Sequence, residues 1–288
     1  MWKRQKTGSV ICPACGNLVG VRDKNCFHCG RWNPSIWGFG PAVRFFAEDF
    51  SFSQIVLWGC SILYIATLAV GIGNTPPQSG FSFFSPSNKV LFLFGSSGAA
   101  PVFVYGRWWT VLSAAWLHGN LIHILFNMMW VRQLVPATAE LFGQSRLVIL
   151  YTVSSITGFL LTSFAGAFLG FLPIPFLRGA SFTVGASAPI FGLLGALVYY
   201  GRRVGSSFLG RQAWTFAVIL FLFGLFLPFV DNYAHLGGFL GGYAASEWLG
   251  PERPERLNHH LLALICVAAT FLSIAVSVVL GLKQFASG

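Results

Sequence analysis

Charged side chains are scarce in this chain of 288 residues. Asp, Glu, Lys and Arg together make up 9% of it, far below the roughly 25% that is usual in soluble domains. Acidic residues are the scarcest, with eight Asp and Glu against eighteen Lys and Arg. Hydrophobic residues make up 55%, and the mean hydropathy is +0.68. This composition excludes an ordinary soluble domain and predicts a polytopic membrane protein.

The start of the chain lacks the short apolar run of a cleavable signal peptide. Met1 is followed by Trp-Lys-Arg-Gln-Lys and a polar stretch, so we expect the first apolar segment to remain as an uncleaved anchor. The net charge of +10 would suggest nucleic acid in a soluble protein. Here we attribute it to basic residues between membrane spans and expect no nucleic-acid partner.

Four of the six cysteines form two Cys-x-x-Cys pairs, each followed by glycine: Cys12 with Cys15, and Cys26 with Cys29. This spacing is typical of a structural zinc site with four thiolate ligands. Two disulfides are the alternative, and they require an oxidising compartment. His28 lies between two ligands and is interpreted as a surface residue. The other two cysteines, in apolar runs, are interpreted as packing residues.

We divide the chain into a zinc-ribbon-like domain (1–34), a linker or interfacial segment (35–52), a core of six transmembrane helices (53–250), and a cytoplasmic loop, seventh helix and tail (251–288). The ribbon has too few apolar residues for a core, so zinc should supply its folding energy. Its partner is left open: its basic residues can meet anionic lipid headgroups or another protein, or simply face solvent. They are Lys3, Arg4, Lys6, Arg22, Lys24 and Arg31.

Seven apolar runs predict an all-α membrane protein, because only helices or closed barrels satisfy every backbone polar group within lipid. The runs are 55–73, 108–131, 147–172, 185–200, 213–230, 233–249 and 261–282. Between the first two lies a long connection, 74–107, rich in Gly, Ser and Pro. Its apolar patch at 90–94 is too short to span and is placed in the interface.

The distribution of Lys and Arg predicts the orientation. Fourteen fall on the side of the N-terminus, and four (Lys89, Arg107, Arg178 and Lys283) fall on the other. The N-terminus is therefore predicted to be cytoplasmic and the C-terminus outside, in the plasma (inner) membrane. The ribbon would then lie in a reducing compartment, which favours zinc over disulfides.

A lone hydroxyl, Ser187, opens one of the apolar runs within Gly-Ala-Ser-Ala-Pro. The cytoplasmic anchor Arg202 lies fifteen residues later, roughly 22 Å along a helix, while the hydrocarbon core is about 30 Å thick. Ser187 should thus lie below the outer surface. The non-helical backbone that precedes it, 172–184, is tolerated at that depth only against protein or water, so we expect a buried aqueous pocket. His235 heads another apolar helix at similar depth and can serve as its base. Small residues on both helices allow the approach that this requires.

His123 and Asn127 lie four residues apart, on one helical face, and both can donate hydrogen bonds to a negative oxygen. With the Ser187 backbone N–H they form a candidate oxyanion hole. His118 does not share that face well and is interpreted as support for the outer loop. Asp231 precedes a helix, where an acid normally caps the first turn. We therefore predict a Ser–His dyad rather than a triad.

These motifs resemble the rhomboid family of intramembrane serine proteases over about residues 50–250. The resemblance rests on a Trp-rich outer loop, His-x-x-x-Asn at His123, Gly-x-Ser at Ser187 and Ala-His-x-x-Gly at His235, in that order. It implies a six-helix core with 261–282 added as a seventh helix. It also implies cleavage of transmembrane substrates near their outer end by Ser187 and His235, without a catalytic cofactor.

The sequence departs from the family pattern at two places. Ala188 and Pro189 follow the nucleophile, where the family usually has glycine, although both suit a first helical turn. The outer loop reads Arg107-Trp108-Trp109, with the arginine ahead of the tryptophans, which bears on how that loop is tethered. Phe191, one turn after Ser187, can pack against His235.

Two other functions fit a membrane protein with buried polar residues. A catalytically silent rhomboid-like adaptor would bind transmembrane segments, but it should have lost Ser187 or His235, and both are present. A channel or transporter should show internal repeats and paired half-helices, and the sequence shows no repeat.

Overall fold

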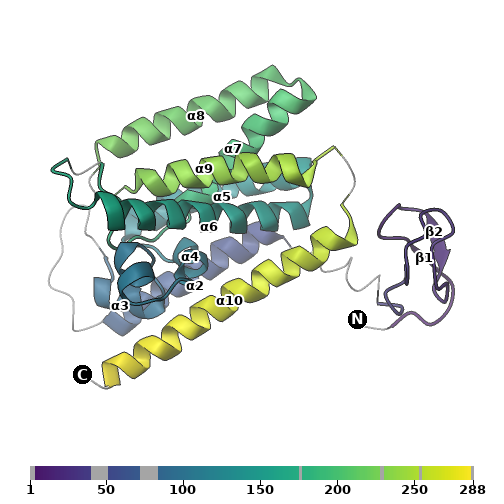
Figure 1. Ribbon diagram of the computed structural model, residues 1–288, viewed down its shortest axis with the longest axis horizontal. Helices are drawn as coiled ribbons and strands as arrows, with labels where there is room; N and C mark the ends of the chain where they lie inside the picture. The colour runs from purple at the N-terminus through teal and green to yellow at the C-terminus, as the bar shows by residue number, and fades with distance from the viewer. Residues whose placement is uncertain are drawn as a thin grey trace.

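The computed structural model describes residues 4–39, 51–71, 84–174, 177–227, 230–252 and 255–286. The described residues form a bundle of helices and a small N-terminal ribbon that lies beyond one end of the bundle (Figure 1). The ribbon contains the only two described strands, β1 (Ser9–Ile11) and β2 (Leu18–Gly20), which pair antiparallel with Val10 opposite Val19. Apart from this hairpin, the elements of the described residues are all helical, as the sequence predicted.

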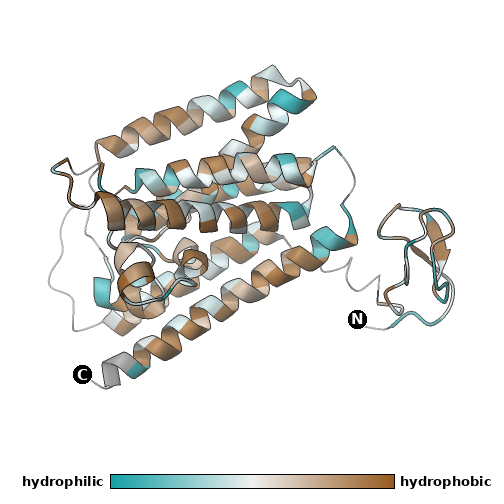
Figure 2. Ribbon diagram, in the orientation of Figure 1, coloured by the Kyte–Doolittle hydropathy of each residue, from teal (hydrophilic) through white to brown (hydrophobic). Residues whose placement is uncertain are grey.

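Seven of the described helices have eighteen residues or more. They are α2 (Phe52–Gly71), α5 (Leu121–Phe142), α6 (Gln144–Leu169), α7 (Ser187–Val204), α8 (Ser207–Leu225), α9 (Asn232–Leu249) and α10 (Leu257–Ala286). Four of them, α2, α6, α8 and α10, are long and apolar enough to cross a membrane by composition alone. Figure 2 shows the contrast, with α10 brown over most of its length and α9 mixed. The lower hydropathy of α5, α7 and α9 reflects the glycines and polar residues predicted to form the site.

The second predicted run, 108–131, was wrong in its limits. Its first part forms two short turns, α4 (Thr110–Ser113) and η3 (Ala114–Trp116), and the long helix α5 begins only at Leu121. The cause is Asn120, whose side chain caps the helix by accepting from the His123 N–H at 2.7 Å. The helix then continues past Pro136 to Phe142, so Arg132 lies inside it on an exposed face and not in a loop.

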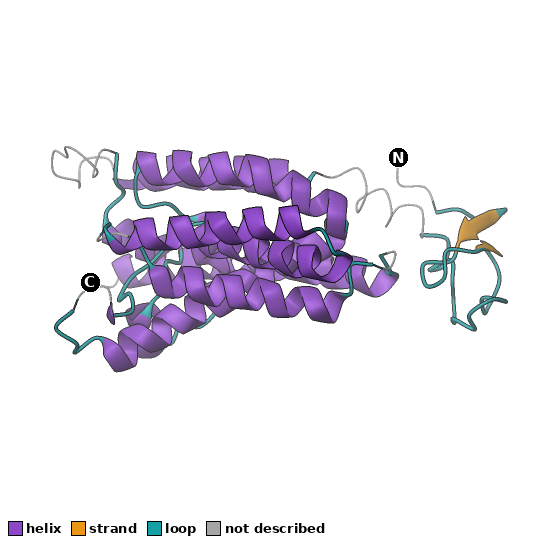
Figure 3. Ribbon diagram, turned by 90° about the horizontal axis from the view of Figure 1, so that it is seen from above, coloured by secondary structure: helices purple, strands orange, loops and turns teal. Residues whose placement is uncertain are grey.

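Helix α6 forms the centre of the bundle. In its most apolar window 67% of the residues are buried, compared with 17% in α8 and 22% in α10. It packs against α7 and α9, which also pack extensively against each other, while α10 covers another side of α6. Figure 3, seen from above, shows the long helices of the bundle running along one another. Helix α6 is therefore enclosed by its neighbours, whereas α8 and α10 lie at the periphery of the bundle.

The long outer connection folds into short elements against the bundle. The apolar patch at 90–94 falls in the short helix α3 (Asn88–Phe94), and a π-helical segment, η2 (Ala100–Val104), follows. The early part of the predicted connection, 74–83, lies outside the described residues. Arg107 is buried beside α3: its Nη1 donates to the Phe92 carbonyl at 2.9 Å, and its guanidinium lies 4.1 Å from the Phe92 ring centre.

The ribbon extends beyond the limit that the sequence suggested. The Gln5 N–H donates to the Gly38 carbonyl at 2.9 Å, and the Arg4 side chain donates to the Trp37 carbonyl. These bonds tie Trp37 and Gly38, within the expected linker 35–52, to the start of the ribbon. Residues 40–50 of the expected interfacial segment, with Pro41, Phe45 and Phe46, lie outside the described residues.

Candidate functional site

Ser187 is the first residue of α7, as the sequence indicated. The backbone that leads to it has no long regular element in its described part: Thr183 pairs with Ser97 through N–H···O bonds of 3.0 and 2.8 Å, and the Gly185 N–H donates to the Ala114 carbonyl at 2.9 Å. Pro175, within the predicted irregular segment, lies outside the described residues. The nucleophile candidate therefore stands where a non-helical segment, fastened to the outer connection, turns into a helix.

His235 lies in the first turn of α9. Asp231 caps this helix, its side chain accepting from the Ala234 N–H at 3.0 Å, as predicted from the sequence. The His235 ring is 6% exposed and stacks on Phe191, with ring centres 4.1 Å apart and planes 11° from parallel. Because Phe191 lies one turn after Ser187, this stacking brings the start of α9 against the start of α7.

Helices α7 and α9 approach until their backbones touch. A methyl group added at Gly238 would clash with the Ala188 carbonyl, and one added at Gly242 would clash with the Gly192 carbonyl. Glycine at these positions therefore permits the close crossing that the sequence predicted.

His123 faces the same place as Ser187. A Cβ added to Gly185 would lie 2.7 Å from His123 Nε2 and 3.6 Å from Ser187 Oγ. The Gly119 N–H donates to His123 Nδ1 at 3.4 Å, which places the proton of the neutral ring on Nε2. Asn127 is buried, and its amide donates to the His123 carbonyl at 2.9 Å, leaving one N–H of that amide for another acceptor.

In the part of the chain that the structure describes, no hydrogen bond joins Ser187 to His235, and His235 Nδ1 is buried without a partner. Asp231 does not supply one, because its carboxylate caps α9. His118 is buried, and its ring meets that of His123 edge-on, 5.2 Å between centres. It thus packs against the ring of the oxyanion candidate His123.

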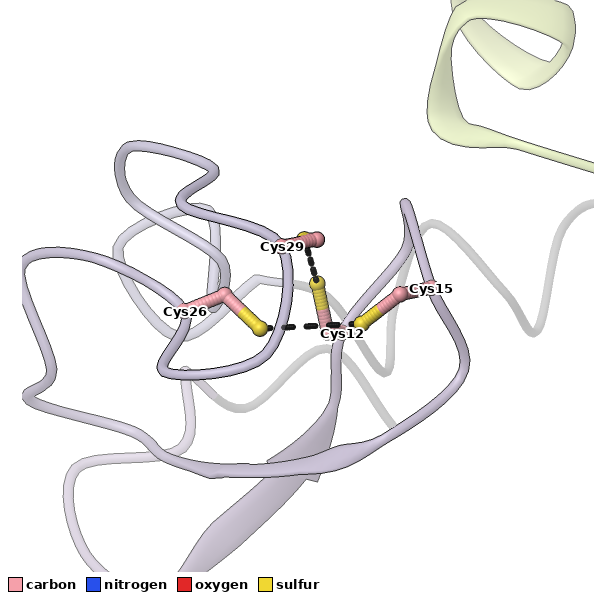
Figure 4. Close-up of side chains that lie close together, drawn as sticks. All are labelled: Cys12, Cys15, Cys26 and Cys29. Atoms are coloured by element: carbon pink, nitrogen blue, oxygen red, sulfur yellow. Dashed lines mark hydrogen bonds between the residues drawn. The ribbon is translucent and has the colours of Figure 1, made fainter.

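The four paired cysteines come together in the ribbon (Figure 4), with all four sulfurs within 4.8 Å of one another. Cys12 Sγ lies 3.8 Å from Cys29 Sγ, and Cys15 Sγ lies 3.6 Å from Cys26 Sγ. Four thiolates at about 2.3 Å from a tetrahedral zinc ion stand roughly 3.8 Å apart, so the residues fit zinc. His28 is exposed and outside the cluster, as predicted.

The two cysteine pairs have matching backbone bonds. The Gly16 N–H donates to the Cys12 carbonyl and the Gly30 N–H to the Cys26 carbonyl, both at 2.9 Å. The backbone N–H of Asn17 lowers the pKa of the Cys15 thiol, whereas the neighbouring cysteines raise the pKa of Cys29. A bound cation would favour the thiolate form of all four. The remaining cysteines, Cys60 and Cys266, lie buried and half-buried among apolar residues of the bundle.

A model of the Rhomboid domain matches residues 105–252, slightly more than half of the chain. The chain belongs to the rhomboid family. The "Rhomboid protease GluP" of Bacillus subtilis (strain 168) is 30% identical over 217 residues, covering 73% of this chain and 38% of that protein. "RHOMBOID-like protein 4" of Arabidopsis thaliana is 28% identical over 62% of this chain and 48% of that protein. This rhomboid thus spans less than half the length of either relative.

The sequence did not reveal one residue of the rhomboid core, Gly158 on α6. A Cβ there would lie 2.6 Å from the Ala234 carbonyl oxygen and 2.8 Å from the Ala188 methyl group. Gly158 is therefore the point where α6 meets α7 and α9 together. Its only sequence signal was a glycine inside an apolar run, which by itself has many meanings.

Proposed function

We propose that this rhomboid is an intramembrane serine endopeptidase that cleaves transmembrane segments of other membrane proteins near their outer end. The observation that carries the proposal is the stacking of His235 on Phe191, 4.1 Å between ring centres, one turn from Ser187 at the head of α7. A hydroxyl and an imidazole so placed suit nucleophilic catalysis. The relatives named as rhomboid proteases support the same reaction class.

In the proposed reaction the Ser187 hydroxyl attacks the scissile carbonyl carbon while His235 takes its proton. The imidazolium then gives that proton to the leaving amine, and water hydrolyses the acyl-enzyme by the same route. The short hydrogen bond between Ser187 and His235 is expected in the substrate complex, since such bonds are often long in a free enzyme. His235 acts without a carboxylate partner, because Asp231 caps the helix.

The oxyanion of the tetrahedral intermediate would be held by His123 Nε2–H, the free N–H of Asn127 and the Ser187 backbone N–H. The bond from the Gly119 N–H to His123 Nδ1 keeps the Nε2 proton toward Gly185, on the side of Ser187. Donors fixed before the charge develops lose little free energy by reorganising.

The proposed domain limits and orientation agree with this chemistry. We place the ribbon (1–34, with 35–38 attached) on the cytoplasmic side of the plasma membrane. There it would hold a structural zinc ion through Cys12, Cys15, Cys26 and Cys29. The Leu257 N–H, at the start of α10, donates to the Pro13 carbonyl of the ribbon at 3.2 Å. Helix α9 runs from His235 to the end that adjoins α10, so the site lies toward the opposite, outer end (Figure 1).

The test is cleavage of a single-span substrate in proteoliposomes by the wild type, Ser187→Ala and His235→Ala. Ser61→Ala serves as the matched control, because its hydroxyl bonds only to the Leu57 carbonyl of its own helix. We expect cleavage to fall to background in the first two variants and to persist in the control. Labelling of Ser187 by a fluorophosphonate checks the nucleophile directly.

Two outcomes would contradict the proposal. Folded wild type that neither cleaves nor takes up the fluorophosphonate would favour a silent adaptor that binds transmembrane segments. Cleavage that survives Ser187→Ala would assign the reaction to another residue.

A further inference from the structure

Helix α10 lies on the far side of the outer connection from the nucleophile. It packs against α3, α4 and α6, and its contact with α3 reaches backbone level: a Cβ on Gly281 would lie 2.9 Å from Leu93 Cα. A helix that served only as an extra anchor would not need this close fit to short elements of the connection between α2 and α5.

Two serines of α10 hold one tryptophan of that segment. Ser273 Oγ donates to the Trp109 carbonyl at 2.7 Å, and Trp109 Nε1 donates to Ser277 Oγ at 3.0 Å. The serines lie four residues apart, on one face of α10, and are 3% and 0% exposed. Trp109 is the residue directly before α4, so its carbonyl and its ring are both fixed where α4 begins.

The segment held by α10 leads directly to the nucleophile. Helix α4 is fastened on another side by α6, where Ser155 Oγ donates to the Val111 carbonyl at 2.7 Å. At its end the fully buried Ala114 accepts the Gly185 N–H at 2.9 Å. Gly185 is two residues before Ser187, and a Cβ on it would lie 2.7 Å from His123 Nε2. Hydrogen bonds therefore connect α10 to the backbone that presents the proposed nucleophile and oxyanion donor.

We propose that α10 is a positioning element of the catalytic site, acting through Ser273 and Ser277 on Trp109. The two hydroxyls fix α4, α4 fixes the Ala114 carbonyl, and that carbonyl fixes the Gly185 backbone against His123. Neither serine touches substrate, so both are positioning residues. This inference rests on the proposed function, and it assigns the seventh helix to the chemical step and not to substrate binding.

The experiment measures kcat and KM in proteoliposomes for Ser273→Ala/Ser277→Ala, with Thr270→Val as the matched control. Thr270 is on the same buried face, but its hydroxyl bonds only to the Cys266 carbonyl of its own helix. We expect kcat of the double variant to fall about 10-fold with KM unchanged, because small displacements of reacting groups lower the rate strongly. Thr270→Val should keep both constants. Ser273→Thr/Ser277→Thr, which retains the hydroxyls, should restore most of kcat.

A second pair of variants removes the hydrogen bond between Trp109 and Ser277 from either side. It tests the inference even if Ser273→Ala/Ser277→Ala does not fold. Trp109→Phe removes the Nε1 donor, and Ser277→Ala removes its acceptor. Each should lower kcat by a similar factor, and their combination should lower it no further, since they remove the same interaction.

Unchanged kcat in these folded variants, a change confined to KM, or fully additive losses for Trp109→Phe and Ser277→Ala would overturn the inference. Failure of the proposed function has a different signature: the wild type itself would neither cleave nor react with a fluorophosphonate. Wild-type cleavage that depends on Ser187 but ignores the α10 variants would leave the protease assignment intact and remove only the role of α10.

Discussion

Gly185 is the residue at which backbone geometry and the proposed chemistry meet. Its φ of +136° disfavours any side chain, and a Cβ there would also stand 2.7 Å from His123 Nε2. Gly205 has a φ of +77° with no neighbouring atom within 4 Å of such a Cβ. Alanine at either position would strain the backbone, but only alanine at Gly185 would also push a methyl group into the site. Comparing the two variants therefore distinguishes the two effects.

We expect Gly185→Ala to lower kcat on the order of 10²-fold, because the new methyl displaces His123. Gly205→Ala should cost only stability, about 1–2 kcal/mol from the left-handed backbone. Cleavage kinetics and thermal unfolding of both variants check this. Equal loss of kcat in the two would mean that strain, and not the position of His123, accounts for the effect.

The side-chain amide of Asn127 has two N–H groups, and it donates one of them to the His123 carbonyl. The second is available for another acceptor. If the other binds the oxyanion, Asn127→Ala should lower kcat about 10²–10³-fold with little change in KM. Gln133→Ala, an exposed amide on the same helix, is the control and should have no effect. A loss in KM alone would place Asn127 in substrate binding.

At the scale of elements, the close crossing of α7 and α9 decides whether Ser187 and His235 can meet. A methyl group at Gly238 would collide with the Ala188 carbonyl, whereas at Gly210 on α8 the nearest atom is 3.4 Å away, an ordinary contact. Both glycines lie inside helices, where alanine is intrinsically favoured over glycine by up to about 1 kcal/mol.

Gly238→Ala should therefore destabilise the bundle by about 1–3 kcal/mol through overpacking, and activity should fall with it. Gly210→Ala should be neutral or slightly stabilising. Thermal unfolding in one detergent, with cleavage assayed alongside, compares the two. A Gly238→Ala variant as stable and active as Gly210→Ala would show that α7 and α9 can separate without consequence.

At the scale of the whole molecule, the ribbon and the bundle have separate cores. The ribbon core contains Val10, Val19 and Val21 with Cys12 and Cys26, and no residue of the bundle core. So small a core cannot fold the ribbon unaided, and metal binding is expected to supply the free energy. Loss of zinc should then be felt locally.

Chelation of the purified protein should release about one zinc ion per chain and remove hydrogen-exchange protection from residues 4–39. Protection at Leu257, which bonds to Pro13, should fall as well, while the melting temperature of the bundle stays unchanged. Cys12→Ser should behave like the chelated protein, and Cys60→Ala, which lies in the bundle, should keep its zinc. A large fall in the bundle melting temperature would mean that the ribbon supports the whole fold.

Much of this protein could be read from local sequence. Cys-x-x-Cys-Gly repeated at short range predicted the cluster of four cysteines, because each pair needs only a short turn to meet. The opening residues of α7 and α9 were predictable because Ser187 follows non-helical backbone and Asp231 caps a helix. Hydropathy failed at 108–131, where it joined the apolar turns α4 and η3 to α5, since an apolar average does not register the cap at Asn120.

The sequence by itself determined the membrane character, the cysteine pairs that could hold a metal ion and the residue types available for catalysis, since these depend on composition and short spacing. Only the tertiary structure decided which of them meet: His235 against Phe191, His123 against Gly185, Gly158 between two helices, and α10 on Trp109. These contacts join residues far apart in the chain, so they depend on how closely whole helices pack. A local sequence pattern does not specify how closely two helices pack.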